Sequence, residues 1–214
     1  MSNGTKVALK LTLVTYEKGD KLGWLLSIIS LAPIFLYVAE TSLVLFRREY
    51  FGLTLLSGQL ANEVLNVILK VSFAQPRPVG GEQSEYGMPS AHSQSMFFVT
   101  SYVIFTLSRQ RHKPLCDLEK SLLYSFLLIC SVLVSFSRIY LGYHSIRQVI
   151  VGAFVGCLLG YFWTLFSEKG NKGLLSLLNS FSFLKSLYFK DSLKVCHFLK
   201  REQMQCSRCD ECAK

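Results

Sequence analysis

Long apolar runs separated by short polar stretches dominate this chain of 214 residues. Five runs are long or apolar enough to be considered as membrane spans: Leu22–Phe46, Gly52–Phe73, Gln94–Ser108, Ser121–Phe136 and Gln148–Phe166. A helix needs about 20 residues to cross a bilayer, a length that the first run exceeds and the third and fourth only approach. The pattern predicts an all-α protein, a polytopic membrane bundle of about five transmembrane helices.

The regions outside these runs divide the chain into three parts. Residues 1–21 form a polar leader, residues 22–166 hold the five runs, and residues 167–214 are basic and rich in cysteine. Within the last part, Leu174–Leu199 mixes Leu, Phe and Tyr with regularly placed lysines. This composition favours an added interfacial helix lying on the membrane surface rather than a sixth span.

Composition supports a membrane protein and argues against some other classes. The chain is 50% hydrophobic with a mean hydropathy of +0.34, and its net charge is +9. The positive charge is typical of cytoplasmic loops and a basic tail, because such loops carry an excess of Lys and Arg. Nucleic-acid binding is not expected, since no basic stripe lies on a soluble domain.

The cysteines and one glycosylation motif admit alternatives. Seven cysteines, an odd number with two inside predicted spans, do not resemble a disulfide framework. Cys206, Cys209 and Cys212 have metal-ligand spacing, but a closed zinc site needs four ligands, so a reduced or acylated cytosolic tail is the alternative. Asn3 begins an Asn-Gly-Thr sequon, a match short enough to arise by chance.

Several polar residues interrupt the first two runs. Glu40 lies late in the first run, and a carboxylate there is either functional or paired. Asn62, Glu63 and Asn66 fall on roughly one helical face of the second run and must face away from lipid. Hydrogen bonding between helices is one explanation of these three residues, and direct substrate contact is the other.

Chain direction gathers charged and polar residues on one side of the membrane. Lys70 ends the second span, His92 begins the third, Arg138 ends the fourth and His144 precedes the fifth. Because successive spans alternate in direction, these four positions share one face. Arg47, Arg48 and Arg109 lie on the opposite face, so the positive-inside tendency places the His92 face outside the cytosol.

The stretch Gly87–Gln94 predicts a helix start with room for an anion. Pro89 followed by Ser90 is a helix-start signature, because serine caps free backbone N–H groups. The unpaired N–H groups of a helix N-terminus attract phosphate, and His92 lies among them.

Together, the residues on this face describe a phosphate site. They are three cations, one hydroxyl and two imidazoles: Lys70, Arg77, Arg138, Ser90, His92 and His144. Such cations bind phosphate oxygens and stabilise them during phosphoryl transfer. One histidine can attack phosphorus while the other protonates the leaving oxygen, although the residues alone do not say which attacks. No carboxylate cluster accompanies them, so a divalent metal is not expected.

Three sequence blocks resemble the signature of the type 2 phosphatidic acid phosphatase superfamily. They are Lys70-x6-Arg77-Pro78, Pro89-Ser90-Ala91-His92 and Ser137-Arg138-x5-His144, and the longer stretches Glu85–Gln94 and Ser137–His144 are similar to the dolichyldiphosphatase branch. The resemblance implies a metal-independent phosphatase without cofactors, in the endoplasmic reticulum membrane and facing the lumen. Its implied substrate is a polyisoprenoid diphosphate, dolichyl diphosphate, whose hydrolysis recycles the lipid carrier of protein N-glycosylation.

The resemblance also implies a role for each site residue. His144 would be the nucleophile that forms a phosphohistidine, and His92 the acid that protonates the leaving group. Lys70, Arg77, Arg138 and Ser90 would hold phosphate, together with a backbone N–H at Ala91. The wider superfamily usually has Gly at position 91 and Asp at position 148. Gln148 lies one helical turn after His144, and its carbonyl can fix the tautomer of that histidine without offsetting an imidazolium charge. The resemblance to the dolichyldiphosphatase branch, where Gln is usual at this position, implies a subfamily difference rather than an inactive site.

Three other functions fit the same residues. A broader lipid phosphate phosphatase would act on phosphatidate or other isoprenoid phosphates. A lipid diphosphate transferase would pass the phosphoryl group to an alcohol instead of water. An inactive membrane scaffold is a third reading, although scaffolding does not require all five of the charged and imidazole residues. Membrane lipids are the expected surroundings, and no pattern specifies an oligomeric state.

Overall fold

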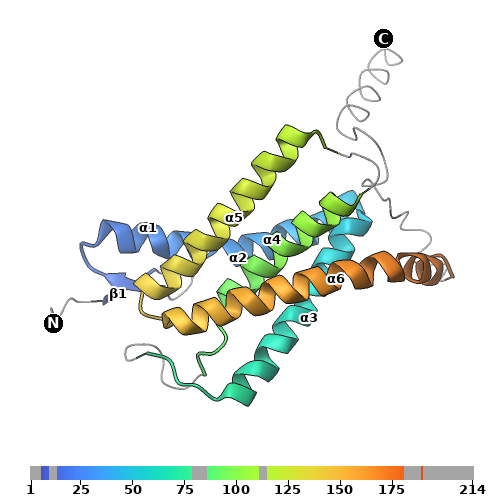
Figure 1. Cartoon of the computed structure of the whole chain (residues 1–214). Coiled ribbons are helices and arrows are strands. Elements are labelled where there is room, and N and C mark those ends of the chain that lie inside the picture. The colour runs from blue at the N-terminus through green and yellow to red at the C-terminus, as the bar shows by residue number, and fades with distance from the viewer. Residues whose placement is uncertain (1–5, 10–13, 79–85, 111–114, 181–188, 190–214) are drawn as a thin grey trace, which may run out of the picture.

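The protein is a helical bundle with a small hairpin at its N-terminus (Figure 1). The computed structural model describes residues 6–9, 14–78, 86–110, 115–180 and 189. In chain order the elements are β1 (Lys6–Leu9), β2 (Val14–Glu17), α1 (Lys21–Ile29), α2 (Ala32–Ser42), the π-helical turn η1 (Leu43–Arg47), α3 (Tyr50–Phe73), α4 (Ala91–Arg109), α5 (Asp117–Tyr140) and α6 (Ile146–Ser180). The predicted all-α class is therefore right in its coarse form.

The burial pattern is inverted relative to a water-soluble bundle. Among the fully buried side chains are Gln59, Asn62, Gln94, Ser131 and Thr164, while Phe35, Val38, Val64, Phe126 and Phe154 are more than 60% exposed. Polar groups inside and apolar groups outside suit a bilayer, where the outer surface meets lipid. Within the part of the chain that the structure describes, three helical stretches are long and apolar enough to cross a membrane: Lys21–Arg47, Asp117–Tyr140 and Ile146–Glu168.

The first predicted span is not one regular helix. It is divided into α1, α2 and η1, with a break at Ser30 and Leu31. Pro33 lies at the start of α2, where its missing N–H is tolerated, and proline disfavours helical backbone just before it. The hydroxyl of Ser30 donates to the carbonyl of Ser27 at 2.7 Å, which satisfies a backbone acceptor at this break.

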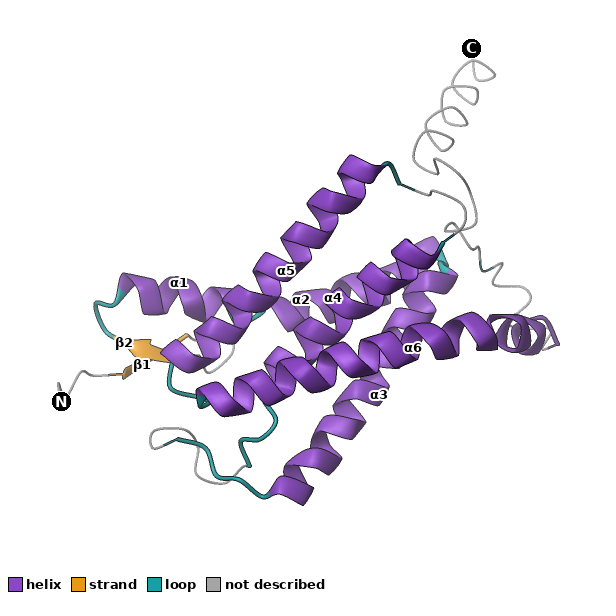
Figure 2. Ribbon diagram, in the orientation of Figure 1, coloured by secondary structure: helices purple, strands orange, loops and turns teal. Residues whose placement is uncertain are grey.

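The leader, for which the sequence predicted only polarity, contains the hairpin. Strands β1 and β2 pair antiparallel, from Lys6 opposite Glu17 to Leu9 opposite Val14. Figure 2 shows the two strands beside the N-terminal end of α1, and all the other regular elements that it draws are helices. The hairpin thus lies near the connection between α5 and α6, which carries His144.

Helix α4 is the centre of the bundle and packs against α3, α5 and α6 (Figure 1). Its contact with α6 depends on glycines at every fourth position of α6, Gly152, Gly156 and Gly160. A Cβ atom at Gly152 would lie 2.7 Å from the carbonyl oxygen of Ser90, and one at Gly160 would lie 2.7 Å from that of Phe98. Small residues at this spacing let two helix backbones approach closely, so the two parallel helices begin side by side.

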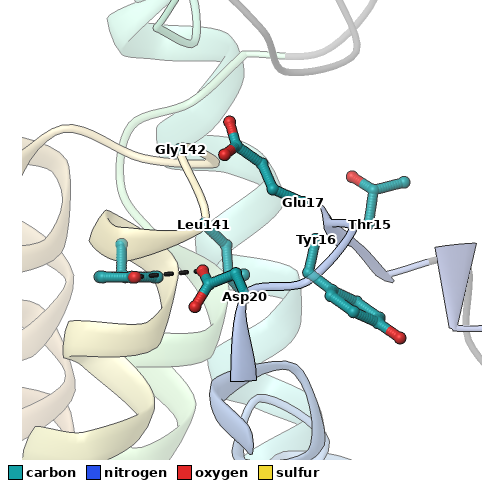
Figure 3. Close-up of a pocket in the computed structure, with 7 residues that line it drawn as sticks. Thr15, Tyr16, Glu17, Asp20, Leu141 and Gly142 are labelled. Carbon is teal, nitrogen blue, oxygen red and sulfur yellow. Dashed lines mark hydrogen bonds between the residues drawn. The ribbon is translucent and has the colours of Figure 1, made fainter. Parts of the chain in front are cut away.

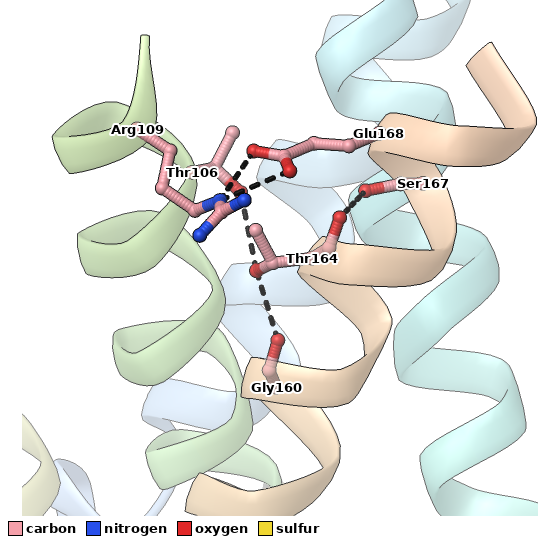
Figure 4. Close-up of polar contacts among 6 residues, drawn as sticks. All are labelled: Thr106, Arg109, Gly160, Thr164, Ser167 and Glu168. Carbon is pink, nitrogen blue, oxygen red and sulfur yellow. Dashed lines mark hydrogen bonds and ion pairs between the residues drawn. The ribbon is translucent and has the colours of Figure 1, made fainter.

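The C-terminal end of α4 is joined to the middle of α6 by polar contacts (Figure 4). Arg109 donates from Nε to both carboxylate oxygens of Glu168, at 2.8 and 3.0 Å. The hydroxyls of Thr106 and Thr164 are 3.4 Å apart. Since the ion pair is exposed, we ascribe little stability to it, and the glycine contact dominates this interface.

Some predictions fall on residues that the structure does not describe. These are the Asn3 sequon, the metal-ligand spacing of Cys206, Cys209 and Cys212, and most of the predicted interfacial helix Leu174–Leu199. Helix α6 runs past the predicted end of the fifth span at Phe166 as far as Ser180. The first residues of the predicted interfacial segment are therefore continuous with α6.

Candidate active site

Three segments meet at the end of the bundle where α4 and α6 begin. They are the chain that follows α3, the start of α4 and the turn between α5 and α6. The N–H of Ser90 donates to the carbonyl of Gln148 at 3.0 Å, and the N–H of Gly87 donates to that of Gln75 at 2.7 Å. An isolated bridge also pairs Pro76 with Tyr86. These backbone contacts hold together segments that are far apart in the sequence.

The predicted charged residues are brought together by this arrangement. His92 interacts electrostatically with Arg138, His144, Lys70 and Arg77. His144 interacts in the same way with Arg138, Arg77 and Lys70. The common face inferred from chain direction is therefore present in the structure, where both imidazoles lie near positively charged side chains.

Ser90 occupies the N-cap position of α4 but does not cap it. Its backbone is extended, with φ −67° and ψ 115°, and its side chain makes no capping hydrogen bond. The Oγ atom is fully buried and has no hydrogen-bond partner among the described residues. The expectation of a serine cap was wrong in this respect. A buried hydroxyl without a partner is costly, so this one is available to a bound anion, as are the first N–H groups of α4 from Ala91 onward.

Arg138 lies at the end of α5 with only 6% of its surface exposed. Its Nε atom has no hydrogen-bond partner, and no carboxylate is paired with it, in the part of the chain that the structure describes. Buried arginines are usually paired with an anion. An anion bound between Arg138 and the start of α4 would supply the partner.

His144 follows Arg138 in a tight turn, and its side chain is 4% exposed. The N–H groups of Tyr143 and His144 both donate to the carbonyl of Arg138 at 3.1 Å. Burial, followed by the charges of Arg138 and Arg77, lowers the pKa of His144 from 6.5 to about 4. The imidazole is therefore neutral at physiological pH, which is the state that a nitrogen nucleophile requires.

Gln148 is held in one orientation and faces His144. Its Nε2 donates to the carbonyl of Pro76 at 3.0 Å, and its Oε1 accepts from the N–H of Ser145 at 3.1 Å. These two contacts leave Oε1 as the atom 3.3 Å from Nδ1 of His144. Because Oε1 only accepts, Nδ1 carries the proton and Nε2 keeps its lone pair. Gly87 makes this possible, since a Cβ there would lie 2.7 Å from Nε2 of Gln148.

A buried amide network supports the start of α4 from the side of α3. Nε2 of Gln94 donates to Oδ1 of Asn62 at 2.9 Å, and Nδ2 of Asn66 donates to Oε1 of Gln94 at 2.8 Å. Asn66 also donates to the carbonyl of Pro89 at 3.4 Å. Hydrogen bonding between helices, one of the two explanations offered for Asn62 and Asn66, is therefore correct.

The carboxylates of Glu63 in α3 and Glu40 in α2 have different surroundings. Glu63 accepts a hydrogen bond from the hydroxyl of Tyr37 at 3.1 Å and interacts electrostatically with Lys70. Glu40 is 2% exposed, and neither of its carboxylate oxygens has a hydrogen-bond partner among the described residues. Glu40 is therefore not paired among the described residues, although pairing was one of the two alternatives offered for it.

Sequence reasoning missed three residues that shape the site. Gln94 was treated only as the start of a span, Gly87 only as part of a polar stretch, and Tyr143 only as part of a motif. A glutamine three residues into an apolar helix is a usable signal, because a buried amide needs partners. Gly87 and Tyr143 act through contacts distant in sequence, for which no local pattern exists.

Comparison with known proteins identifies the family. The sequence profile of the PAP2 superfamily matches residues 51–172, which include all three segments of the site. The chain is 38% identical to human dolichyldiphosphatase 1 over 168 residues, covering 74% of this chain and 71% of that protein. The chain belongs to the PAP2 superfamily.

Further members of the PAP2 superfamily resemble the chain over most of its length. The dolichyldiphosphatase of Saccharomyces cerevisiae is 34% identical, with 91% of this chain and 84% of that protein covered. Among solved structures, the phosphatidylglycerolphosphate phosphatase of Bacillus subtilis aligns with a TM-score of 0.60 at 25% identity, over 71% of this chain and 79% of its own. The resemblance inferred from the three sequence blocks is confirmed.

Proposed function

We propose that this PAP2 superfamily member hydrolyses dolichyl diphosphate to dolichyl phosphate and phosphate, recycling the lipid carrier of protein N-glycosylation. One observation carries the proposal. His144, neutral and oriented by Gln148, lies in the same cluster as His92, Lys70, Arg77 and Arg138. Similarity to dolichyldiphosphatases over most of the chain supports the diphosphate as substrate.

In the proposed first step, Nε2 of His144 attacks the terminal phosphorus. The bond from phosphorus to the bridging oxygen breaks, and that oxygen takes a proton from His92 as dolichyl phosphate leaves. Lys70, Arg77 and Arg138 bind the phosphoryl oxygens, with the hydroxyl of Ser90 and the N–H of Ala91. Water then attacks the phosphohistidine while His92 accepts its proton, which releases phosphate and restores His144.

Gln148 is proposed to stabilise the reactive tautomer of His144 throughout. An amide cannot offset the imidazolium charge as a carboxylate would, so the contribution is orientation rather than charge. The positive charge needed at phosphorus comes from three side chains. The proposed reaction therefore needs no divalent metal.

The membrane arrangement is part of the proposal. Five spans would comprise α1 with α2, then α3, α4, α5 and α6 up to Phe166, within a phosphatase domain of residues 22–166. The leader 1–21 and the tail 167–214 would flank it. The site would face the lumen of the endoplasmic reticulum, which is supported by the arginines at the opposite ends of the helices, Arg47, Arg48 and Arg109.

The direct test is phosphate release by the purified full-length protein in detergent. Dolichyl diphosphate, dolichyl phosphate and phosphatidate are compared at equal concentration, each with and without a chelator. We expect release from the diphosphate that the chelator does not change. Faster release from phosphatidate would favour the broader phosphatase. Consumption of the diphosphate only when an alcohol acceptor is present, with formation of the phosphorylated alcohol and no free phosphate, would favour the transferase. No consumption of any substrate would favour the scaffold. Sensitivity to the chelator would contradict the metal-free mechanism.

Replacing Gln148 with alanine tests the orienting role. We expect kcat to fall about tenfold, the equivalent of one hydrogen bond, with KM changed less than about twofold. Gln148→Glu is the comparison variant. It keeps an oxygen acceptor for His144 but loses the donor to the carbonyl of Pro76, so its turnover should lie between those of the wild type and Gln148→Ala. Steady-state kinetics of the three proteins give the answer. Unchanged turnover in Gln148→Ala would show that the contact with His144 has no function.

A further inference from the structure

Tyr143 connects the N-terminal hairpin to Arg138. The guanidinium carbon of Arg138 lies 4.1 Å from the centre of the Tyr143 ring. On the other side, the hydroxyl of Tyr143 accepts a hydrogen bond from the N–H of Thr15 at 2.8 Å and lies 3.1 Å from the hydroxyl of Thr15. A residue of β2 thus holds an aromatic ring against the arginine that belongs to the phosphate site.

Arg138 requires an external support of this kind. Its Nε atom has no hydrogen-bond partner and no carboxylate is paired with it among the described residues. An arginine side chain has four rotatable bonds, and ordering it without a partner is unfavourable in entropy. A guanidinium held over an aromatic ring gains roughly 0.5–2 kcal/mol, and more when it is desolvated. The ring also leaves the edge of the guanidinium, with its N–H groups, directed away from the stacking face.

Hydrogen bonds join the N-terminal segment to the end of α5 and to the turn that follows it. A cavity of ≈ 330 Å³ separates parts of the two segments, lined by Thr15, Tyr16, Glu17, Asp20, Tyr140, Leu141 and Gly142. Across it, the hydroxyl of Tyr140 donates to Asp20 at 3.1 Å, as Figure 3 shows. The contact of Thr15 with Tyr143 is the second hydrogen-bonded contact between these parts of the chain. It is the one that lies next to the charged cluster.

We propose that Tyr143 is a positioning residue, which the N-terminal hairpin holds in place so that its ring orients the guanidinium of Arg138 for a phosphate group. This inference rests on the proposed function, because there Arg138 holds phosphate. It assigns a role to one of the unspecified positions between Arg138 and His144 in the sequence signature, and gives the hairpin a role in the reaction. The backbone of Tyr143 contributes as well, because its N–H donates to the carbonyl of Arg138 at 3.1 Å.

The test is a double-mutant cycle read by phosphate-analogue binding and by kinetics. The proteins are wild type, Tyr143→Leu, Arg138→Gln and the double variant, each full length in detergent. Orthovanadate binding is measured by calorimetry, and KM and kcat with dolichyl diphosphate. We expect Tyr143→Leu to weaken orthovanadate binding about tenfold and to raise KM similarly, as the loss of a cation–π contact implies. In the Arg138→Gln background the same change should cost less than about twofold, because no cation is left over the ring.

Two further variants separate the ring from its tether. Tyr143→Phe keeps the ring and loses the hydroxyl, so its orthovanadate affinity should fall by about threefold, between wild type and Tyr143→Leu. Tyr161→Leu is the matched control, because this tyrosine of α6 contacts Phe105 at a ring distance of 5.0 Å, away from the charged cluster. It should bind orthovanadate as the wild type does. If Tyr143→Leu does not fold, Tyr143→Met takes its place, since both lack an aromatic face.

The outcomes distinguish this inference from the proposed function. An equal loss of orthovanadate affinity from Tyr143→Leu in both backgrounds would show that Tyr143 does not act through Arg138, and would overturn the proposal. Wild-type affinity in Tyr143→Phe would overturn the role of the hairpin. Failure of the proposed function would instead appear as wild-type protein that releases no phosphate from dolichyl diphosphate, while the cycle on orthovanadate binding could still be measured.

Discussion

Replacing His144 with alanine is expected to reduce phosphate release by at least roughly 10⁴-fold, because the variant loses the atom that forms the covalent intermediate. The geometry favours His144 over His92 for this role. Gln148 fixes its tautomer, with Oε1 at 3.3 Å from Nδ1, so the lone pair of Nε2 is left for the attack. Phosphate release from dolichyl diphosphate and trapping of ³²P-labelled protein measure the effect.

His92→Ala separates the two histidines by their chemistry. As the acid, His92 protonates the bridging oxygen, so its loss should cost about 10²–10⁴-fold with dolichyl diphosphate. An aryl phosphate such as 2,4-dinitrophenyl phosphate, whose phenol is more acidic than the phosphate ester that leaves from dolichyl diphosphate, needs no proton donor. We therefore expect it to restore much of the turnover of His92→Ala and none of that of His144→Ala.

Ile146→Ala is the matched control for both variants, because this residue is 60% exposed and only two positions from His144. It should behave as the wild type with either substrate. Label on the protein in His144→Ala, or rescue of that variant by the aryl phosphate, would assign the attack to another residue. Equal rescue of both variants would contradict distinct roles for the two histidines.

The sequence predicted the helices and the gathering of charge because both follow from long-range regularities. Apolar run length located α3, α4 and α5 and the start of α6 within a few residues, whereas α6 continues to Ser180, past its predicted end at Phe166. Alternation of chain direction then placed Lys70, His92, Arg138 and His144 at one end of the bundle. Neither inference depends on how particular side chains pack, which is why both survive in the structure.

Other features could not be predicted because they arise from contacts between distant residues. The break between α1 and α2 had a local signal in Pro33, but a proline inside an apolar run is also compatible with a continuous kinked helix. Ser90 is a residue type that commonly caps helices, so its failure to cap α4 comes from its surroundings in the folded protein and not from the residue type. The fixed amide of Gln148 needs the carbonyl of Pro76, which is 72 positions away in the sequence.

The geometry of the site depends most on the close approach of α4 and α6. The two helices come closest to each other at Gly156. A Cβ at Gly156 would overlap the carbonyl oxygen of Gln94 and would lie 3.0 Å from the backbone nitrogen of Phe98. These are backbone atoms of a helix, so they cannot rotate away as a side chain could. The helices must separate instead, and overpacking of this kind costs roughly 1–3 kcal/mol or more.

Gly156→Val is therefore expected to lower the unfolding temperature of the detergent-solubilised protein by several degrees, as roughly 1–3 kcal/mol implies. It should also remove most phosphate release, because separating α4 from α6 moves His92 away from His144. Thermal unfolding, monitored by size-exclusion chromatography, measures the change in unfolding temperature. The phosphate assay measures the loss of activity. Cys157→Val is the matched control, since it adds bulk at the next position, where the side chain is exposed. A Gly156→Val protein as stable and active as Cys157→Val would show that the bundle tolerates a wider spacing, and that the glycines do not set the distance between the two histidines.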